Sequence, residues 1–411
     1  MDESEPAIKP ARWTVTDRGE DTSAMEPLVL PAGSPHRGAL NDLALELAAA
    51  SSGFRRSLPP GLVAPLATLV RAMNCYYSNL IEGHDTHPVD IERAMRHDYS
   101  HVPEQRNLQL EARAHVEVQQ WLDDGGVRGR AATVDAIREI HRRFAALLPR
   151  DLLVVSEPDT GRAITGTGGE LRREDVQVGR HLAVSPGAVP RFLTRFEAVY
   201  SRLGRSDTIL AAAAAHHRLL WIHPFADGNG RVARLMSHAS LLEALDTGGL
   251  WSVVRGLARQ AADYRQHLAA CDMARRNDLD GRGTLSEEAL AAFTIFFLRT
   301  CLDQVRFMED LVQPDRLRDR ILLWAQDEIL AGFLPARSGQ LLETVLFRGE
   351  LRRGDVPGRL GVSERAARRV VSALLERGVL SSASTRAPLF ITFPAALASR
   401  WLPGLFPEPQ V

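Results

Sequence analysis

The feature that most restricts the fold is a tight loop between two helical segments, residues 223–230, which reads His-Pro-Phe-Ala-Asp-Gly-Asn-Gly. The segment before it, Thr208 to Ile222, is rich in alanine and leucine, which favours a helix. Pro224 and the glycines end that helix. Apolar residues then return at helical spacing from Val232 to Leu242, so a second helix should begin near Asn229. The chain is therefore expected to form a helix-loop-helix here.

The composition of this loop predicts a site for phosphate and a cation. Backbone N–H groups at the start of the second helix lack partners within the helix and attract an anion such as phosphate. Arg231 and Arg234 add guanidinium groups suited to phosphate oxygens. Asp227 can hold a divalent cation, as magnesium usually sits on one carboxylate plus substrate oxygens. His223, at the other lip, is free to accept a proton from an attacking hydroxyl.

The segment from His223 to Arg234, HPFADGNGRVAR, resembles the signature of the Fic (filamentation induced by cAMP) family at every defining position. The resemblance implies transfer of part of a nucleotide, usually AMP from ATP, onto a Ser, Thr or Tyr hydroxyl of a target protein. It makes His223 the catalytic base and Asp227 the magnesium ligand. The nucleotide phosphates are assigned to Gly228, Asn229, Gly230, Arg231 and Arg234. The alternative is a chance helix-loop-helix with a buried histidine.

The whole chain sets broader limits. At 411 residues and 45% hydrophobic composition it exceeds one ordinary domain and can fill sizeable cores. A net charge of −1 excludes a chain-wide basic field for nucleic acid but leaves room for a local patch. Cys75, Cys271 and Cys301 lack metal-site spacing, so free thiols in a reducing compartment are expected. Without a signal-like or membrane-spanning apolar run, we expect a cytoplasmic protein with no membrane contact.

The region before the core predicts a lead-in and then helices. Residues 1–37 carry scattered prolines and little periodicity, which indicates an extended segment that could lie along the folded body. Residues 38–100 are expected to be helical, with one helix from Leu62 to about Ile81 that Gly83 would stop. Glu82 at this helix end opposes the helix dipole and would gain from a cationic partner elsewhere. The alternative is a solvated surface glutamate.

The stretch Ser78-Asn-Leu-Ile-Glu82-Gly83 resembles the inhibitory motif of the Fic subclass whose autoinhibitory helix precedes the catalytic core. The resemblance implies that Glu82 pairs with Arg234, takes the place of the γ-phosphate and keeps the α-phosphate of ATP out of line for attack. The commonest form of the motif has Asn after the glycine, where this chain has His84. The same residues would also serve removal of AMP, with Glu82 orienting a water.

Residues 101–305 are expected to form the catalytic core. Val176 and Val178, next to Gly179, suit a short hairpin within a glycine-rich stretch, and an ordinary surface hairpin is one explanation. In the Fic family a hairpin here is the flap, which positions the target's hydroxyl segment through backbone pairing. The resemblance places the flap at Val176, Gln177, Val178 and Gly179. Tyr264, in a helix expected from Trp251 to Ala270, sits where relatives contact the nucleoside, unless it only packs in the core.

The C-terminal part changes character. Residues 306–336 predict a helical connector, and residues 337–411 resemble a winged helix-turn-helix, with strands on either side of Ser382–Ala387. From Arg348 to Arg377 eight arginines face four acids, which gives about +4, enough for phosphate contacts. The candidate nucleic-acid contacts on the last helix are Arg365, Arg368 and Arg369. A domain for protein contacts or dimerisation is the alternative, since no base-reading Asn or Gln stands out there.

The sequence thus predicts a mainly α fold, a Fic-type helical bundle with one β-hairpin flap and a C-terminal winged-helix domain. The expected activity is that of a protein adenylyltransferase that uses ATP and Mg²⁺ and is restrained by Glu82. Two alternatives stay open, namely a deAMPylase and a nucleotide-sensing, DNA-binding regulator. The expected partners are a protein target, DNA in the second alternative, and a second copy of the chain if the C-terminal domain dimerises. The identity of the target is not readable from the residues.

Overall fold

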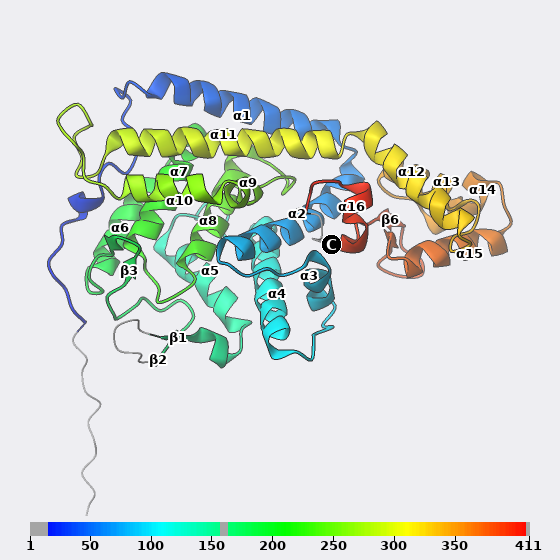
Figure 1. Cartoon of the computed structure of the whole chain (residues 1–411). Helices are drawn as coiled ribbons and strands as arrows, with labels where there is room; N and C mark the ends of the chain where they lie inside the picture. Colours follow the sequence, from blue (N-terminus) through cyan, green and yellow to red (C-terminus); the bar gives the residue numbers. More distant parts are fainter. Residues whose placement is uncertain (1–14, 157–162, 408–411) are drawn as a thin grey trace, which may run out of the picture.

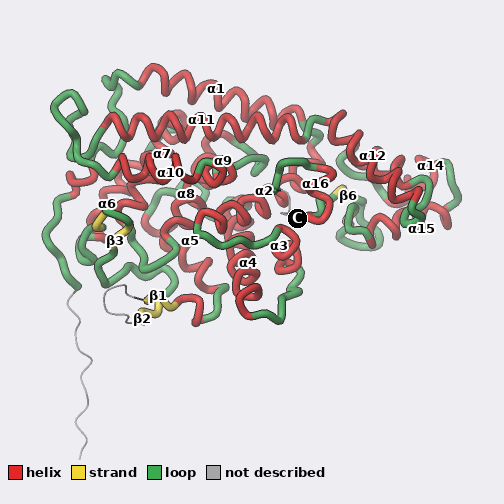
Figure 2. Tube along the Cα trace, in the orientation of Figure 1, coloured by secondary structure: helices red, strands yellow, loops and turns green. Residues whose placement is uncertain are grey.

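The computed structural model describes residues 15–156 and 163–407, and this part of the chain is mainly helical (Figures 1 and 2), as predicted. Its helices before the connector are α1 (Arg37–Ser57), α2 (Pro60–Ile81), α3 (Pro88–Met95), α4 (Pro103–Asp123), α5 (Val134–Ala146), α6 (Val189–Tyr200), α7 (Arg205–Ile222), α8 (Asn229–Leu245), α9 (Val254–Arg259), α10 (Ala261–Cys271) and α11 (Glu287–Leu311). They are followed by α12 (Pro314–Leu330), α13 (Ser338–Arg348), α14 (Val356–Leu360), α15 (Glu364–Glu376) and α16 (Ala398–Trp401).

Helices α7 and α8 pack along each other at the centre of the molecule. The run of alanines from Ala211 to Ala215 is buried, and small side chains allow a close approach between helices. On α8, Val232, Leu235 and Met236 are buried in the same core. Helices α1 and α11 run side by side along one edge of the molecule (Figure 1). The loop predicted to be functional therefore joins the two innermost helices.

The strands form three separate antiparallel pairs. Strands β3 (Gln177–Val178) and β4 (His181–Leu182) make the hairpin that the sequence predicted, and β5 (Leu380–Ser381) pairs with β6 (Phe390–Ile391) on either side of the expected C-terminal turn. The pair β1 (Val154–Ser156) and β2 (Ala163–Thr165) was not anticipated, because each strand is only three residues long and shows no alternation of its own. We call the β3–β4 hairpin, residues 176–183, the flap.

The N-terminal lead-in is part of the core where the structure describes it. Met25, Leu28 and Leu30 are buried, and a 3₁₀ turn at Thr22–Met25 is capped by Asp21. The rest of the expected lead-in, residues 1–14, lies outside the described residues. Residues 15–37 therefore lie along the folded body, as the sequence allowed, because burying Met25, Leu28 and Leu30 removes apolar surface from water.

One helix expected from Trp251 to Ala270 is in fact two. Helix α9 ends at Arg259 and α10 begins at Ala261, with Gln260 between them outside the helical region at φ −114° and ψ 39°. The residues on both sides have good helix propensity, so the break comes from packing rather than from the local sequence.

The C-terminal region folds as α13, α14 and α15 followed by the β5–β6 pair, in the predicted order. Ser363 caps α15 by accepting a hydrogen bond from the Ala366 N–H. Residues near the end of the chain return to the helical body, where the Tyr77 hydroxyl donates to the Leu405 carbonyl at 3.0 Å and Arg255 donates to the Gly404 carbonyl at 2.8 Å. The C-terminal region is therefore fastened to α2 and α9.

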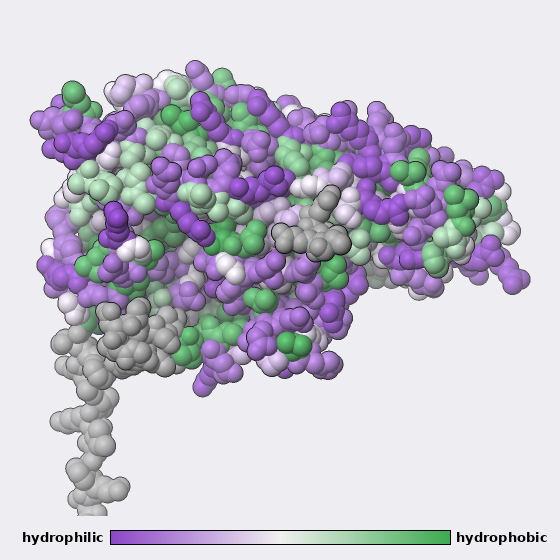
Figure 3. Space-filling view, in the orientation of Figure 1, coloured by the Kyte–Doolittle hydropathy of each residue, from purple (hydrophilic) through white to green (hydrophobic). Residues whose placement is uncertain are grey.

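The surface in Figure 3 is mostly hydrophilic, with small hydrophobic areas scattered between the charged residues. Among the helices of residues 15–156 and 163–407, none combines the length and apolar character needed to pass through a bilayer.

Candidate active site

The loop between α7 and α8 is shaped by two residues in the left-handed region. His223 ends α7 with φ 51° and ψ 62°, and Gly228 precedes α8 with φ 75°. Glycine adopts this conformation freely, whereas a histidine does so at a cost of roughly 1–3 kcal/mol. The His223 N–H still bonds to the Leu219 carbonyl at 3.1 Å, so the left-handed turn directs the imidazole away from the path of the helix. His223 therefore keeps its left-handed backbone only because neighbouring contacts hold it in that conformation.

Asn229 closes the loop from inside. Its side-chain oxygen accepts the Phe225 N–H at 3.0 Å, and its side-chain NH₂ donates to the Phe225 carbonyl at 2.9 Å. The Phe225 ring stacks on His141 of α5 at 4.0 Å between centroids, and His141 accepts the Gly169 N–H at 2.8 Å. The two bonds hold the side chain of Asn229 against the Phe225 peptide and close the loop.

His223 has the electrostatics of a neutral base. Burial lowers its pKa to about 4, and the positive charge of Arg172 acts in the same direction. Its imidazole is therefore uncharged at neutral pH and has a lone pair to accept a proton. Asp227, at the opposite lip, is exposed over 63% of its side chain, and its nearest cation is Arg231 at 3.8 Å.

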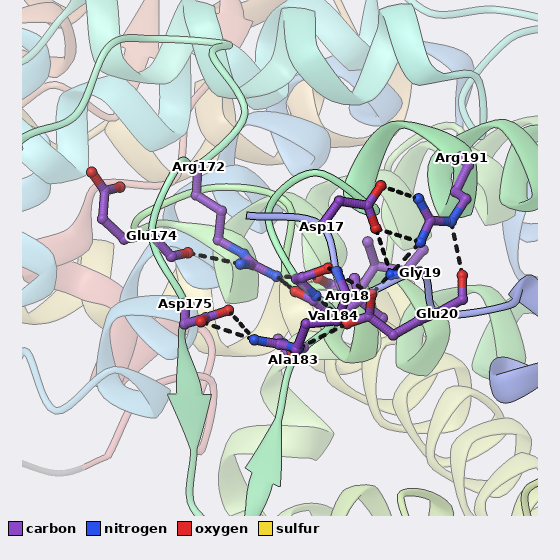
Figure 4. Close-up of polar contacts among 12 residues, drawn as sticks. Asp17, Arg18, Gly19, Glu20, Arg172, Glu174, Asp175, Ala183, Val184 and Arg191 are labelled. Carbon is purple, nitrogen blue, oxygen red and sulfur yellow. Dashed lines mark hydrogen bonds and ion pairs between the residues drawn. The ribbon is translucent and has the colours of Figure 1, made fainter. Parts of the chain in front are cut away.

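Arg172 is a site residue that sequence reasoning missed. Its guanidinium is buried, with 3% of the residue exposed, and takes part in no ion pair found in the described residues. It donates instead to four carbonyls, those of His223 at 2.6 Å, Ile222 at 3.3 Å, Glu174 at 2.8 Å and Val184. Figure 4 labels Arg172 with Glu174 and Val184. Burial lowers the pKa of Arg172 to about 10, so it stays charged at neutral pH. Its direct partners are carbonyls, and the carboxylates of Asp175, Glu20 and Glu174 act on its charge from farther away. No sequence pattern marks a residue whose bonded partners are carbonyls.

The flap is the second element of the site. Gly179 makes its turn at φ 59°, and its edges present Val178, 49% exposed, and Leu182, 56% exposed. His181 bonds through Nε2 to the Trp221 carbonyl at 2.8 Å, which joins the flap to the end of α7. The predicted hairpin is confirmed, whereas its role in holding a target stays a prediction.

An N-terminal segment, residues 16–20, braces the base of the flap (Figure 4). Arg18 donates to both carboxylate oxygens of Asp175 at 2.9 Å and to the Ala183 carbonyl at 3.3 Å. Glu20 accepts the Ser185 N–H at 2.7 Å and the Ser185 hydroxyl at 2.6 Å. Arg18 therefore holds the two sides of the hairpin together from outside.

Glu82 lies against the first turn of α8. Arg234, 2% exposed, donates through Nε to the Ser78 hydroxyl at 2.9 Å and forms an ion pair with Glu82 through Nη2. A Cβ placed on Gly230 would lie 2.6 Å from the Glu82 carboxylate, so the carboxylate sits directly over the loop. Burial raises the pKa of Glu82, but the charge and hydrogen bond of Arg234, together with the charges of Arg231 and His84, leave the pKa below its usual value. The predicted ion pair is confirmed.

The end of α2 is built as predicted. Gly83 takes φ 88°, its N–H bonds to the Leu80 carbonyl at 3.1 Å, and the His84 N–H bonds to the Asn79 carbonyl at 2.9 Å. These two bonds are the Schellman arrangement that a left-handed glycine allows. They fix Glu82 as the last residue before the turn, facing α8.

Arg231 and Arg234 reach different neighbours. Arg231 approaches Glu111 of α4 at 3.5 Å and lies 4.9 Å from the centroid of the Phe144 ring. Glu111 in turn contacts His84 at 2.8 Å. A cavity of 300 Å³ opens beside the loop, lined among others by His141, Arg172, Asp227, Gly228 and Arg231. The two arginines thus contact different helices, Arg231 reaching α4 and α5 and Arg234 reaching α2.

Three comparisons identify the domain. Residues 131–241 match the model of the Fic/DOC family. The chain contains a Fic/DOC family domain. The protein adenylyltransferase Fic of Culex quinquefasciatus is 38% identical over 100 residues, which is 23% of this chain and 19% of that protein. The corresponding protein of Drosophila melanogaster is 38% identical over 98 residues, 23% of this chain and 20% of that protein. The chain thus spans about a fifth of the length of the curated relatives it matches.

The likeness to a solved structure reaches further along the chain. A crystal structure of a Fic family protein from Desulfovibrio desulfuricans G20 gives a TM-score of 0.51 at 19% identity, covering 89% of this chain and 98% of that chain. At this identity the likeness shows a shared fold. Several contacts described above come from outside the matched Fic domain, namely those of Glu82, Glu111 and Arg18.

Tyr264 and the three arginines of α15 lie outside the loop between α7 and α8. Tyr264 of α10 is 3% exposed and bonds to His216 of α7 at 2.6 Å, so it lies in the helical core, which favours packing over a nucleoside contact. Arg365, Arg368 and Arg369 are exposed on α15, at the end of the molecule farthest from the flap in Figure 1. Arg368 pairs with Glu364 at 3.0 Å.

The residues of the Fic domain fit a cation that arrives with a nucleotide. Within the described ranges, no cluster of three His, Cys, Asp or Glu side chains could hold a metal ion by itself. Asp227 offers one exposed carboxylate at the rim of a loop whose backbone N–H groups suit phosphate. Magnesium is commonly bound in this way, by one carboxylate plus phosphate oxygens.

Proposed function

We propose that this protein is a protein adenylyltransferase that transfers AMP from ATP to a Ser, Thr or Tyr hydroxyl of a target protein. The support comes from the Fic/DOC domain and from relatives named protein adenylyltransferase Fic. The arrangement of His223, the loop N–H groups and the two arginines has the parts that this reaction needs. A domain of this family without a neutral base beside its phosphate loop would not fit the proposal.

In the proposed reaction, the target hydroxyl oxygen attacks the α-phosphorus of ATP. His223 accepts the hydroxyl proton, the bond between the α-phosphorus and the oxygen of the β-phosphate breaks, and pyrophosphate leaves. The loop N–H groups at the start of α8 stabilise negative charge on the α-phosphate, and Arg231 and Arg234 hold the outer phosphates. Asp227 would hold Mg²⁺, which neutralises phosphate charge when bound. The flap would align the target segment by backbone pairing along its exposed edge.

We propose further that Glu82 restrains this activity. The observation that supports it is the ion pair of Glu82 with Arg234 over Gly230, where an outer phosphate would otherwise bind. A carboxylate and a phosphate cannot share one buried guanidinium and one loop, because like charges repel strongly at short distance. Ser78 holds Arg234 in place for this contact.

The test uses labelled ATP with wild type, Glu82→Gly and Glu82→Gly/His223→Ala. With the label on the α-phosphate, we expect weak labelling of proteins by wild type, strong labelling by Glu82→Gly and none by the double variant. With the label on the γ-phosphate, none of them should label, because pyrophosphate leaves. Labelling from the γ-position would mean phosphate transfer and would overturn the AMP assignment.

A matched control addresses the restraint itself. Glu46 also pairs with an arginine, Arg306, but on the exposed face of α1. Glu46→Gly should label like wild type if the effect of Glu82→Gly comes from the site and not from losing an ion pair. The deAMPylase alternative is tested by adding wild type to protein labelled by Glu82→Gly. Loss of label that depends on Glu82 would favour AMP removal as the main activity.

A second candidate function concerns α15. Arg365 and Arg369 are exposed there and form no ion pair with any described residue, which suits contacts to a phosphate backbone. We propose that the C-terminal region is a winged-helix domain that binds DNA through this face. The full chain should shift a DNA duplex at low salt, and Arg365→Gln/Arg369→Gln should weaken binding and lower its salt dependence, whereas Arg56→Gln should not. No shift at low salt, together with a concentration-dependent mass, would favour dimerisation instead.

A further inference from the structure

The last carbonyls of α7 are bonded by side chains of the flap region. Helix ends leave their final carbonyls without partners inside the helix. Here the Trp221 carbonyl is met by His181, and those of Ile222 and His223 are met by Arg172. A cation at this position is also favoured by the helix dipole. The flap region and the end of the central helix are therefore one hydrogen-bonded unit.

Arg172 bonds both to the flap region and to the end of α7. On one side it bonds to Glu174 and Val184, which precede and follow the flap strands. On the other side its Nε donates to the His223 carbonyl, and its backbone N–H donates to the Pro224 carbonyl at 2.9 Å. His223 is the residue with the costly left-handed backbone, so bonds on both sides of its peptide group hold it in that conformation.

We propose that Arg172 is a positioning residue that locks the flap to the backbone of His223. This inference rests on the proposed adenylyl transfer, in which the flap carries the target hydroxyl and His223 accepts its proton. If flap and base moved independently, the hydroxyl would often lie out of reach of the imidazole. An error of about 1 Å in such an alignment can cost on the order of 10²-fold in rate.

The charge of Arg172 has a second consequence for the base. The charged or titratable groups that act on the His223 imidazole are Arg172, His181 and Asp227. Arg172 is the permanent cation among them, because burial leaves its pKa at about 10. Replacing it by a neutral residue should make the imidazole easier to protonate, whereas lysine should keep it neutral. This separates a positioning role from simple support of the fold.

The experiment compares Glu82→Gly with the same protein carrying Arg172→Gln, Arg172→Lys or Arg202→Gln. Arg202 is an exposed arginine that follows α6 and serves as the control. The rate of labelling from α-labelled ATP is followed from pH 3 to 8, a range that includes the His223 pKa of about 4. The affinity for ATP is measured by calorimetry, and the exchange of flap amides by hydrogen–deuterium mass spectrometry. Circular dichroism checks that each variant is folded.

For Arg172→Gln we expect labelling at neutral pH to fall roughly 10²-fold while ATP affinity changes little. The midpoint of the acid limb should rise by about one pH unit, the size typical of removing one nearby charge. Arg172→Lys should also lose rate, since lysine cannot bond four carbonyls, but should keep the acid limb of the parent. Flap amides should exchange faster in both variants, and Arg202→Gln should match the parent throughout.

Two results would overturn the proposal. One is unchanged flap exchange in Arg172→Gln and Arg172→Lys. The other is loss of rate with the same acid limb in both variants, which would mean that Arg172 only supports the fold. If Arg172→Gln does not fold, unchanged rate and exchange in Arg172→Lys would overturn it alone. Absence of labelling by the Glu82→Gly parent would refute the proposed function, and the exchange measurement would still decide on the lock.

Discussion

Replacing Glu82 by glutamine should have opposite effects on stability and on nucleotide binding. The Glu82 side chain is 33% exposed and that of Arg234 only 2%, so their ion pair lies between an exposed pair and a buried one. Exposed pairs contribute about 0–1 kcal/mol, and breaking a buried pair costs about 3–5 kcal/mol. We take roughly 1.5 kcal/mol for this pair. The free protein should lose about that much stability, since Arg234 stays buried without its carboxylate.

The same energy should appear as a gain in nucleotide affinity. In wild type a phosphate must displace the carboxylate, and in Glu82→Gln it need not, so the variant should bind a non-hydrolysable ATP analogue roughly tenfold more tightly. Calorimetry gives the two dissociation constants, and denaturant unfolding with and without the analogue gives the two stabilities. Glu46→Gln, which breaks the surface pair with Arg306, should change neither. Equal affinities in wild type and Glu82→Gln would refute the idea that the carboxylate stands in the place of a phosphate.

Three further outcomes can be measured. Gly61→Ala should destabilise the protein by more than about 2 kcal/mol in denaturant unfolding, because its Cβ would lie 2.4 Å from the backbone of Gly349. Gly53→Ala, which has open space around it in α1, should be neutral or stabilising, and equal effects of the two substitutions would contradict this reasoning. Asn229→Ala removes both bonds that close the loop, so it should abolish most labelling in the Glu82→Gly background. Its circular dichroism spectrum should be unchanged. Full labelling would show that the loop closes without Asn229. Burial raises the pKa of Glu20, but the hydrogen bonds from Ser185 and the other favourable contacts outweigh it and lower the pKa from 4.5 to about 2. The contribution of Glu20 to stability is therefore present above pH 4.5 and lost as the pH falls towards 2. Glu20→Gln should flatten the profile of stability against pH in that window, and an unchanged slope would count against these bonds.

Sequence reasoning located what depends on local chemistry. The helix stop at Gly83 and the start of α8 at Asn229 both follow from residue types with known backbone preferences. The motif from His223 to Arg234 was recognisable because its functional residues are consecutive. The ion pair between Glu82 and Arg234 could be predicted only because a family motif connects two distant segments.

What sequence reasoning missed depends on tertiary contacts. Arg172 is 51 residues from His223 and bonds only to carbonyls, which every residue possesses, so no pattern marks it. The break at Gln260 likewise falls at a residue with good helix propensity, so the local sequence does not mark it. The bracing of the flap by Arg18 falls in a stretch whose composition indicates only an extended chain. Local sequence therefore determined the elements, and long-range polar contacts determined how the site is held.

The last turn of α2 contacts both the end of the chain and Arg234. Tyr77, which meets the Leu405 carbonyl, is the neighbour in sequence of Ser78, which holds Arg234. Any ligand that pulls the C-terminal region outward would therefore also pull on the helical turn that carries Ser78 and Glu82. A variant shortened before Leu405 would therefore not be suitable for studying the Fic domain alone, because it would also remove a contact of the α2 turn that holds Arg234.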